Sequence, residues 1–170
     1  MFEEVRRDLP TPRHFLRAGR RTVARVIRPL GLAWRAGTLV AMSRVLVDRH
    51  GGEVPDDPEE LRALPGVGPY AAAAFESLHL GRRSPILDGN VVRLYGRLFG
   101  LRTGPETRRS RQFLEMAEHM TPARGVREFN YAMLDFTRGV CTARPKCDGC
   151  PLRDGCVFGR SIESDREEMA

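Results

Sequence analysis

The sequence predicts an all-α protein, and three observations support this fold class. Apolar residues recur at helical spacing through most of the 170 residues, whereas the strict alternation of a half-buried strand is almost absent. Proline, glycine and aspartate mark the ends of these periodic stretches, where helices begin and stop. Hydrophobic residues make up 41% of the chain and charged residues 29%, as in an ordinary globular protein.

Two long helices are predicted in the first third of the chain. The first runs from Phe15 to Ile27 and stops at Pro29-Leu30-Gly31. The second runs from about Ala33 to His50, and Gly51-Gly52 caps its C-terminus.

A short helix and a hairpin follow. Asp57-Pro58-Glu59-Glu60 supplies an N-cap, a proline at the first helical position and a glutamate three residues after the cap. The segment Leu64-Pro65-Gly66-Val67-Gly68-Pro69-Tyr70 then leads into an alanine-rich helix from Tyr70 to Leu80. Two glycines and a helix N-terminus suit phosphate binding. The alternative is a tight helix-helix turn, and in either case we expect Val67 to plug the core.

The second half of the chain predicts three more helices. Asp88 precedes an apolar-periodic helix that stops at Gly100. Beyond Cys156 we expect the acidic stretch from Glu163 to Glu168 to fray. The three predicted helices run from Gly89 to Phe99, from Arg111 to Met120 and from Phe129 to Val140.

All four cysteines lie in the last fifth of the chain, at Cys141, Cys147, Cys150 and Cys156. Their spacing, C-x5-C-x2-C-x5-C, in a chain with no secretory signal suits one four-thiolate metal centre better than two disulfides. The loop Ala143-Arg144-Pro145-Lys146 within this pattern is basic, so we expect the centre to hold it against a negatively charged partner.

The charge balance points to nucleic acid as that partner. The chain has 28 basic and 22 acidic side chains, a net charge of +6, and its only lysine is Lys146. An arginine bias also follows from a GC-rich genome, so charge alone does not decide the function.

Together, the hairpin, the cysteines and the segment Ile86-Leu87-Asp88-Gly89-Asn90-Val91 between them resemble the helix-hairpin-helix DNA glycosylases that carry an iron-sulfur cluster. That family includes endonuclease III, the adenine DNA glycosylases and the thymine-guanine mismatch glycosylases. The resemblance extends from about Pro12 to Phe158 and includes the segments 31–36 and 129–135. It implies a helix-hairpin-helix glycosylase fold, with a partial helical barrel and a helical cluster domain.

The resemblance implies that a base is flipped out of the duplex and its glycosidic bond is cut. Loss of the base builds positive charge on the sugar, so a carboxylate beside the anomeric carbon would stabilise that charge or activate the attacking water. By motif position this carboxylate is Asp88. Asp88 also suits the N-cap of the following helix, and the two roles are compatible.

Tyr70 lies where bifunctional relatives resembling endonuclease III place a lysine. A Schiff base requires an amine, and the only lysine is Lys146 in the cysteine loop, so the resemblance implies a monofunctional enzyme. In having tyrosine at this position, the chain resembles the mismatch enzymes and some adenine glycosylases. The alternative role of Tyr70 is packing on the helix face.

The resemblance also implies DNA phosphate contacts by the hairpin and the cysteine loop, at Leu64, Gly66, Val67, Gly68, Arg144 and Lys146.

For the four cysteines the resemblance implies a structural [4Fe-4S] cluster with one ligand from each. Tetrahedral zinc is the less favoured alternative. Two features depart from the family pattern. The first cysteine gap holds five residues, where six are usual, and Pro69 removes an N–H donor from the hairpin.

We also expect the family's helices ahead of Pro12 to be missing, including one with a pocket glutamate that Glu3 and Glu4 are poorly placed to replace. Two functions therefore stay open. The favoured one is a monofunctional DNA N-glycosylase. Its first candidate substrate is thymine or uracil opposite guanine, and its second is adenine opposite oxidised guanine. The alternative is a catalytically incomplete DNA-binding helix-hairpin-helix and iron-sulfur module, which needs a partner or the missing N-terminal helices. A protein partner or a swapped segment is the expected cover for the open barrel.

We expect three segments. Residues 1–84 form the partial barrel with the hairpin 64–70, residues 85–160 form the iron-sulfur domain, and residues 161–170 form an acidic tail. No stretch reaches the roughly 20 apolar residues of a membrane span, so the expected location is the cytoplasm, at the nucleoid, with double-stranded DNA as partner.

Overall fold

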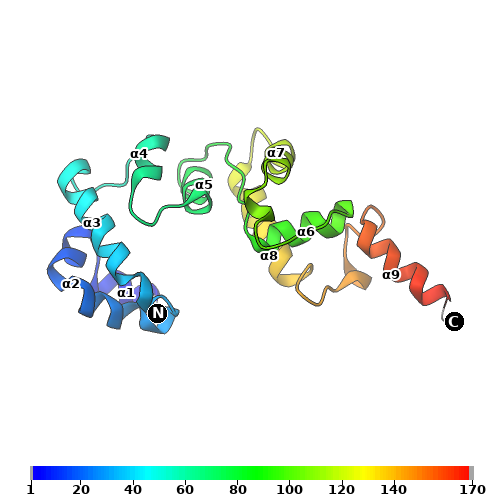
Figure 1. Ribbon diagram of the computed structural model, residues 1–170, viewed down its shortest axis with the longest axis horizontal. Coiled ribbons are helices and arrows are strands. Elements are labelled where there is room, and N and C mark those ends of the chain that lie inside the picture. The colour runs from blue at the N-terminus through cyan, green and yellow to red at the C-terminus, as the bar shows by residue number, and fades with distance from the viewer. Residues whose placement is uncertain (1, 169–170) are drawn as a thin grey trace. The chain divides into compact units, whose positions relative to one another are not determined.

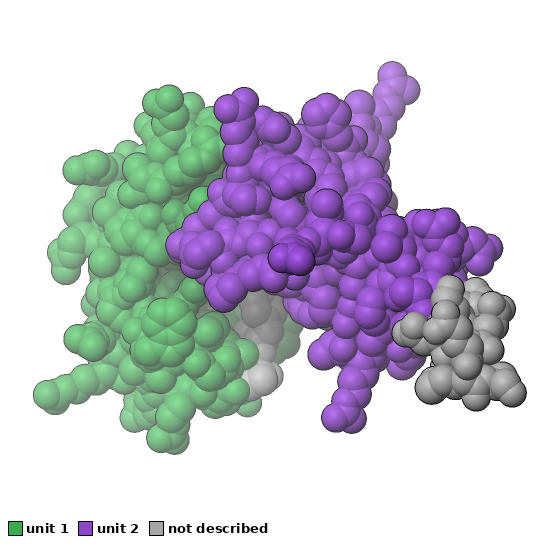
Figure 2. Space-filling model, turned by 45° about the vertical axis from the view of Figure 1, so that its right-hand side comes forward, with its two compact units in different colours: residues 1–72 green, residues 73–170 purple. Residues whose placement is uncertain are grey.

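The computed structural model describes the backbone of residues 2–168 and the side chains of residues 3–162. Helices are the only regular secondary structure in this range, so the all-α prediction is confirmed (Figure 1). The chain divides into two compact units, residues 1–72 and 73–170 (Figure 2), and each is described by itself. Among the described residues, no helix combines the length and apolar character that crossing a bilayer requires.

The first unit is built on α2 (Pro12–Ile27) and α3 (Ala36–His50), which pack against each other and are joined by two single-turn 3-10 helices. Leu9, Val23, Ile27 and Ala36 are buried where helix α2 packs against its neighbours α1 and α3. The elements are α1 (Phe2–Asp8), α2 (Pro12–Ile27), η1 (Arg28–Leu30), η2 (Ala33–Arg35), α3 (Ala36–His50), α4 (Pro58–Ala63) and the first turn of α5 (Pro69–Leu78).

Helix α2 is bent at Gly19. The backbone of Gly19 has φ 67° and ψ 169°, a combination that is open almost exclusively to glycine. The bend divides α2 into a segment of residues 12–18 and a segment of residues 20–27. The sequence prediction of one uninterrupted helix is therefore wrong at this residue, because a single glycine within a periodic stretch does not distinguish a kink from a straight helix.

Helix α4 begins as its capping residues predict. The Asp57 carboxylate accepts hydrogen bonds from the backbone N–H groups of Glu59 and Glu60, both at 2.9 Å. Pro58 is the first helical residue. Leu61, in the last turn of α4, and Leu64, just after it, are both buried.

The second unit is organised around helix α6 (Gly89–Phe99), which packs against α8 (Val126–Gly139) and α9 (Val157–Glu168). Leu87, Val91, Tyr95 and Phe113 are among the buried residues of its core. Gly100 ends α6 in the left-handed conformation. Besides the rest of α5, the elements are α6 (Gly89–Phe99), η3 (Thr107–Arg109), α7 (Arg111–Met120), α8 (Val126–Gly139), η4 (Cys147–Gly149) and α9 (Val157–Glu168).

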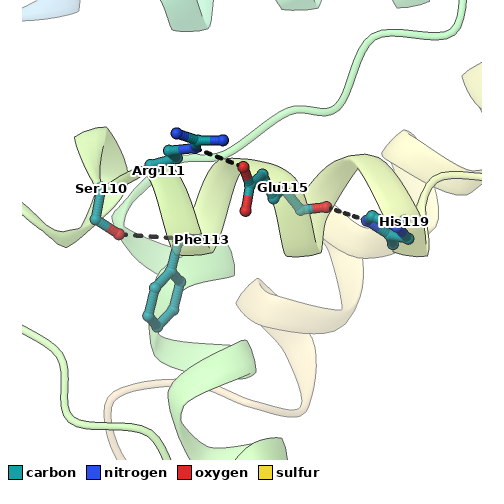
Figure 3. Close-up of polar contacts among 5 residues, drawn as sticks. All are labelled: Ser110, Arg111, Phe113, Glu115 and His119. Carbon is teal, nitrogen blue, oxygen red and sulfur yellow. Dashed lines mark hydrogen bonds and ion pairs between the residues drawn. The ribbon is translucent and has the colours of Figure 1, made fainter.

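Helix α7 shows how local contacts fix a short helix (Figure 3). The Ser110 hydroxyl accepts the backbone N–H of Phe113 at 3.3 Å, and Arg111 pairs with Glu115 at 2.7 Å one turn along. His119 Nδ1 lies 2.7 Å from the Glu115 carbonyl. These contacts leave the Phe113 side chain directed into the core, where it is 3% exposed.

The segment after Cys156 differs from its prediction. The sequence predicts fraying between Glu163 and Glu168, whereas the structure shows one helix, α9, through Glu168. Its first turn is anchored on α6, because the Arg97 guanidinium stacks 5.0 Å from the Phe158 ring and Val157 packs against Gly100. These anchors lie about 60 residues away in the sequence, so acidic composition alone does not reveal them.

Candidate functional site

The hairpin between α4 and α5 depends on Gly66 for its shape. Gly66 has φ +82°, and a Cβ atom at this position would collide with the Thr38 side-chain methyl of α3. The Val67 N–H closes the turn on the Leu64 carbonyl at 3.1 Å. Gly66 is therefore required by the fold of the first unit itself.

Gly68 lies in a different environment from Gly66. Its backbone is not left-handed, and a Cβ atom placed on it would meet nothing within 4 Å. The backbone N–H groups of Gly68, Tyr70 and Ala71 donate no hydrogen bond to another described residue. Pro69 is the first residue of α5 and contributes no N–H. The hairpin thus presents unpaired donors beside an open surface, the arrangement that binds phosphate at helix N-termini.

The other predicted site residues of the hairpin differ in exposure. Leu64 is buried, at 4% exposure, so a contact with an outside ligand would have to come from its backbone. Val67 is half-buried, so the sequence expectation that it plugs the core is not met; Leu64 is the buried apolar residue of the hairpin. Tyr70 is 44% exposed in the first turn of α5.

Asp88 is half-buried and caps helix α6, as predicted. One carboxylate oxygen, Oδ1, accepts the backbone N–H groups of Asn90 and Val91, both at 2.8 Å. The other, Oδ2, accepts the Asn90 side-chain amide at 2.8 Å. Since a carboxylate oxygen has two lone pairs, Oδ2 keeps acceptor capacity for a substrate or a water molecule.

A hydrogen-bond chain leads from Asp88 to the first cysteine. Arg93 Nη1 donates to the Asn90 side-chain oxygen at 3.0 Å, and Arg93 Nη2 donates to the Thr137 carbonyl at 3.0 Å and the Cys141 carbonyl at 2.9 Å. Arginine only donates, so the Asn90 oxygen must face Arg93 and its nitrogen must face Asp88. Sequence reasoning missed Asn90 and Arg93, although their spacing of three residues puts them on one face of the helix that Asp88 caps.

The four cysteines surround one cavity in the second unit. Cys141 is buried, the other three are half-buried, and none forms a disulfide. All four line one small hollow with a cavity volume of about 20 Å³, together with apolar side chains such as Leu94 and Phe136. Among the described residues, no three histidine, cysteine or acidic side chains converge closely enough to hold a single ion. The thiols are therefore arranged around a space and do not meet at one point.

Burial raises the pKa of the Cys147 thiol, and the nearby sulfurs of Cys150, Cys156 and Cys141 raise it further, while Arg97 opposes them. Ionisation of several neighbouring thiols is unfavourable, because their negative charges repel one another. A bound metal or cluster would supply the compensating positive charge.

Arg97 connects helix α6 to the cysteine loop. Its Nη1 lies 3.6 Å from Cys141 Sγ and donates to the Thr142 carbonyl at 2.5 Å, and its Nη2 donates to the Ala143 carbonyl at 2.9 Å. Sequence reasoning also missed this residue. Its partners lie more than 40 positions away, so no local pattern identifies it.

The basic side chains of the cysteine loop remain exposed while its backbone is held. The Lys146 N–H donates to the Val140 carbonyl at 3.0 Å, and the Thr142 hydroxyl donates to the Arg144 carbonyl at 2.5 Å. The side chains of Arg144 and Lys146 are exposed and form no hydrogen bond or ion pair with the described residues. The loop therefore presents two unpaired cations on a fixed backbone.

Comparison with known families and sequences agrees with this geometry. The helix-hairpin-helix motif family matches residues 49–75. A thymine/uracil-DNA glycosylase of Pyrobaculum aerophilum is 37% identical, covering 96% of this chain and 74% of that protein. A thymine-DNA glycosylase of Aeropyrum pernix is 36% identical over 93% of this chain and 73% of its own length. An adenine DNA glycosylase of Mycobacterium tuberculosis is also 36% identical, but only half of it is covered.

Solved structures give the same result. A thermostable thymine-DNA glycosylase superposes with a TM-score of 0.85 at 29% identity, covering 94% of this chain and 75% of that one. Endonuclease III in a non-covalent complex with DNA gives a TM-score of 0.84 at 26% identity, with 96% and 76% covered. The chain therefore belongs to the helix-hairpin-helix DNA glycosylases, and it is an enzyme of base excision repair.

Proposed function

We propose that this protein is a monofunctional DNA N-glycosylase that removes thymine or uracil opposite guanine. The observation that carries the proposal is the Asp88 carboxylate, which is fixed at the start of α6 by three hydrogen bonds and retains a free acceptor position on Oδ2. The Pyrobaculum and Aeropyrum relatives, which act on thymine or uracil by name, support the choice of base.

In the proposed reaction the bond between the base nitrogen and the sugar C1′ breaks, and the base leaves with the electron pair. The sugar then carries positive charge, which the negative Asp88 carboxylate stabilises at short range. Asp88 Oδ2 also accepts a proton from the water that attacks C1′. The departing base anion takes up a proton from solvent, Asp88 returns the proton it accepted to solvent, and the products are the free base and an abasic site.

Strand cleavage through a covalent imine is not part of the proposal. Tyr70 occupies the position at which the bifunctional enzymes carry a lysine, and a phenol does not form an imine with the sugar. Lys146, the only lysine of the chain, belongs to the cysteine loop. Cleavage of the abasic product should therefore need added alkali.

Double-stranded DNA is the proposed partner, bound through its phosphates at two places. One is the hairpin, where the N–H groups of Gly68, Tyr70 and Ala71 are unpaired within the described structure. The other is the cysteine loop, through Arg144 and Lys146. Both contacts are independent of sequence and should weaken as salt increases.

The proposed metal group is a [4Fe-4S] cluster ligated by Cys141, Cys147, Cys150 and Cys156, with a structural role. Four thiols spaced around a cavity fit a cluster in which each thiolate binds a different iron. They fit a single zinc less well, because zinc requires all four sulfurs at about 2.3 Å. Iron and acid-labile sulfide analysis of the purified protein tests this choice, and zinc without sulfide would refute it.

Adenine opposite oxidised guanine is the second candidate substrate, supported by the Mycobacterium relative. A non-catalytic DNA-binding module that depends on a partner chain or a swapped segment is the alternative from another functional class. One experiment separates all three: single-turnover base release from duplexes carrying T·G, U·G or A opposite oxidised G, followed by alkali. Release from the first two supports the proposal, release from the third alone favours adenine, and DNA binding without release favours the module.

A further inference from the structure

The segment around helices α2 and α3 concentrates positive charge beyond anything the proposed active site uses. From residue 10 to residue 50 the sequence has nine arginines and a single acidic residue, Asp48. The whole chain has a net charge of only +6, so this concentration is not an even compositional bias.

Three of these arginines share one side of the helical stretch formed by α2 and the first residue of η1. At 100° per residue, Arg21, Arg25 and Arg28 fall within about 60° of one another on the helix. All three are exposed, whereas Val23 and Ile27 on the opposite side are buried at 0% and 2% exposure. We call Arg21, Arg25 and Arg28 the arginine face.

The arginine face has no internal role in the fold. None of its guanidinium groups forms a hydrogen bond or ion pair with a described residue. In contrast, Arg83, Arg93 and Arg97 of the second unit each donate to backbone carbonyls. Arginines at spacings of three and four on one helix also repel one another. The fold therefore gains nothing from this arrangement, and a polyanion outside the chain would relieve the repulsion.

We propose that the arginine face binds the phosphate backbone of duplex DNA, as a third contact in addition to those of the hairpin and the cysteine loop; this rests on the proposed function. Guanidinium groups bind phosphate bidentately, and charges one helical turn apart match a repeating polyanion. Trp34 follows Arg28 after a short connection. It is 72% exposed, and the Arg35 guanidinium lies 4.9 Å from the centre of its ring. Aromatic and arginine side chains together are typical of nucleic-acid surfaces.

A membrane surface is less suited to this face. An interfacial helix must insert its apolar side into the lipid, and the apolar side of α2 is already buried in the core of the first unit. An acidic protein surface lacks the regular charge spacing of a phosphate backbone. Anionic vesicles and polyglutamate are therefore included as competing ligands in the test.

The test compares the salt dependence of binding to undamaged duplex DNA for two triple variants. Arg21→Gln/Arg25→Gln/Arg28→Gln removes the arginine face and keeps helix propensity. Arg102→Gln/Arg108→Gln/Arg124→Gln removes the same charge from exposed arginines of the second unit that also have no partner among the described residues. The melting temperature shows whether both triple variants fold. Changing Arg21, Arg25 and Arg28 to lysine keeps the charge and should retain most of the wild-type slope.

We expect the slope of log K against log salt to become shallower by roughly 2.7 in the arginine-face variant, about 0.9 for each lost phosphate contact, and by less than about 1 in the control. If the triple variant does not fold, Arg25→Gln alone should lower the slope by roughly 0.9. Equal changes of slope in the two triple variants would overturn the proposal. It would also be overturned if the arginine-face variant kept the wild-type slope for DNA but lost binding to polyglutamate or to phosphatidylglycerol vesicles. Because the readout is binding, absence of base release would refute the proposed function without deciding this point.

Discussion

Asp88 serves two purposes at the residue scale, and its two oxygens divide them. Oδ1 holds the start of α6 by accepting two backbone N–H groups, and Oδ2 faces the Asn90 amide. Because asparagine caps helices about as well as aspartate but carries no charge, Asp88→Asn separates the structural role from the chemical one. Asp88→Ala removes both the cap and the charge, and loss of the cap should lower the free energy of unfolding by about 1 kcal/mol.

Asn90 positions the proposed catalytic carboxylate. Asn90→Ala removes the hydrogen bond to Oδ2, and we expect single-turnover base release to slow about 10-fold with DNA affinity unchanged. Gly89→Ala is the matched control, because a Cβ atom at Gly89 meets nothing within 4 Å. A similar loss in both variants, or none in Asn90→Ala, would contradict the positioning role.

Tyr95 gives a pH test of the second unit. It is 2% exposed, and burial raises its pKa from 10.0 to about 12. The folded state therefore holds the phenol proton more tightly, so its contribution is complete below pH 10 and is lost as pH rises through 12. Two pKa units correspond to roughly 2 to 3 kcal/mol.

Urea unfolding of wild type and Tyr95→Phe between pH 9 and pH 12 measures this contribution. The wild type should lose stability relative to the variant across this range, because phenylalanine cannot ionise. Parallel curves for the two proteins would show that Tyr95 ionises in the folded state as readily as in the unfolded one.

Residue roles could be predicted from the sequence only where the signal is local. Asp88 stands directly before an apolar-periodic helix, and Cys141, Cys147 and Cys150 are close in sequence. Arg93 bonds to Cys141 across 48 positions, and Arg97 bonds to Ala143 across 46. Such contacts are created by the packing of α6 against the end of α8, which no short pattern specifies.

The hairpin is the element whose two glycines should differ most in their effects. Gly66→Ala places a Cβ atom at φ +82° against Thr38, and we expect a loss of roughly 1 to 3 kcal/mol in unfolding free energy. Gly68→Ala should change stability by less than about 0.5 kcal/mol and should weaken DNA binding, because its space is open to a ligand.

Urea unfolding and DNA titration of the two hairpin variants measure these effects separately. Gly66→Ala combined with Thr38→Ser should recover part of the lost stability, since serine lacks the colliding methyl. Equal destabilisation by both glycine substitutions would show that the hairpin has no surface reserved for a ligand.

The bounds of helices with clear capping residues could be predicted closely, as α4, α6 and α7 show. Helix α1 was not predicted, because its seven residues are mostly charged; Val5 of this helix packs against the core of the first unit. Helix α8 begins at Val126, three residues before the predicted start, since Gly125 precedes it in the left-handed conformation.

At the scale of the whole molecule, the cysteine centre should matter for DNA binding through the loop that it holds. Cys150→Ser should remove the cluster, with its iron and sulfide, and lower the salt slope of DNA binding by roughly 2 through loss of Arg144 and Lys146 as phosphate contacts. Arg144→Gln/Lys146→Gln should lower the slope equally while the iron content is retained. A cluster-free protein with an unchanged slope would disconnect the centre from DNA binding.

The central claim is that Asp88 is the catalytic carboxylate of a DNA glycosylase, and Asp88→Asn tests it most directly. Single-turnover release of thymine and uracil opposite guanine should fall by at least about 100-fold in the variant, with melting temperature and DNA affinity close to wild type. Release at the wild-type rate by a folded, DNA-bound Asp88→Asn protein would contradict the account and leave Asp88 as a helix cap alone.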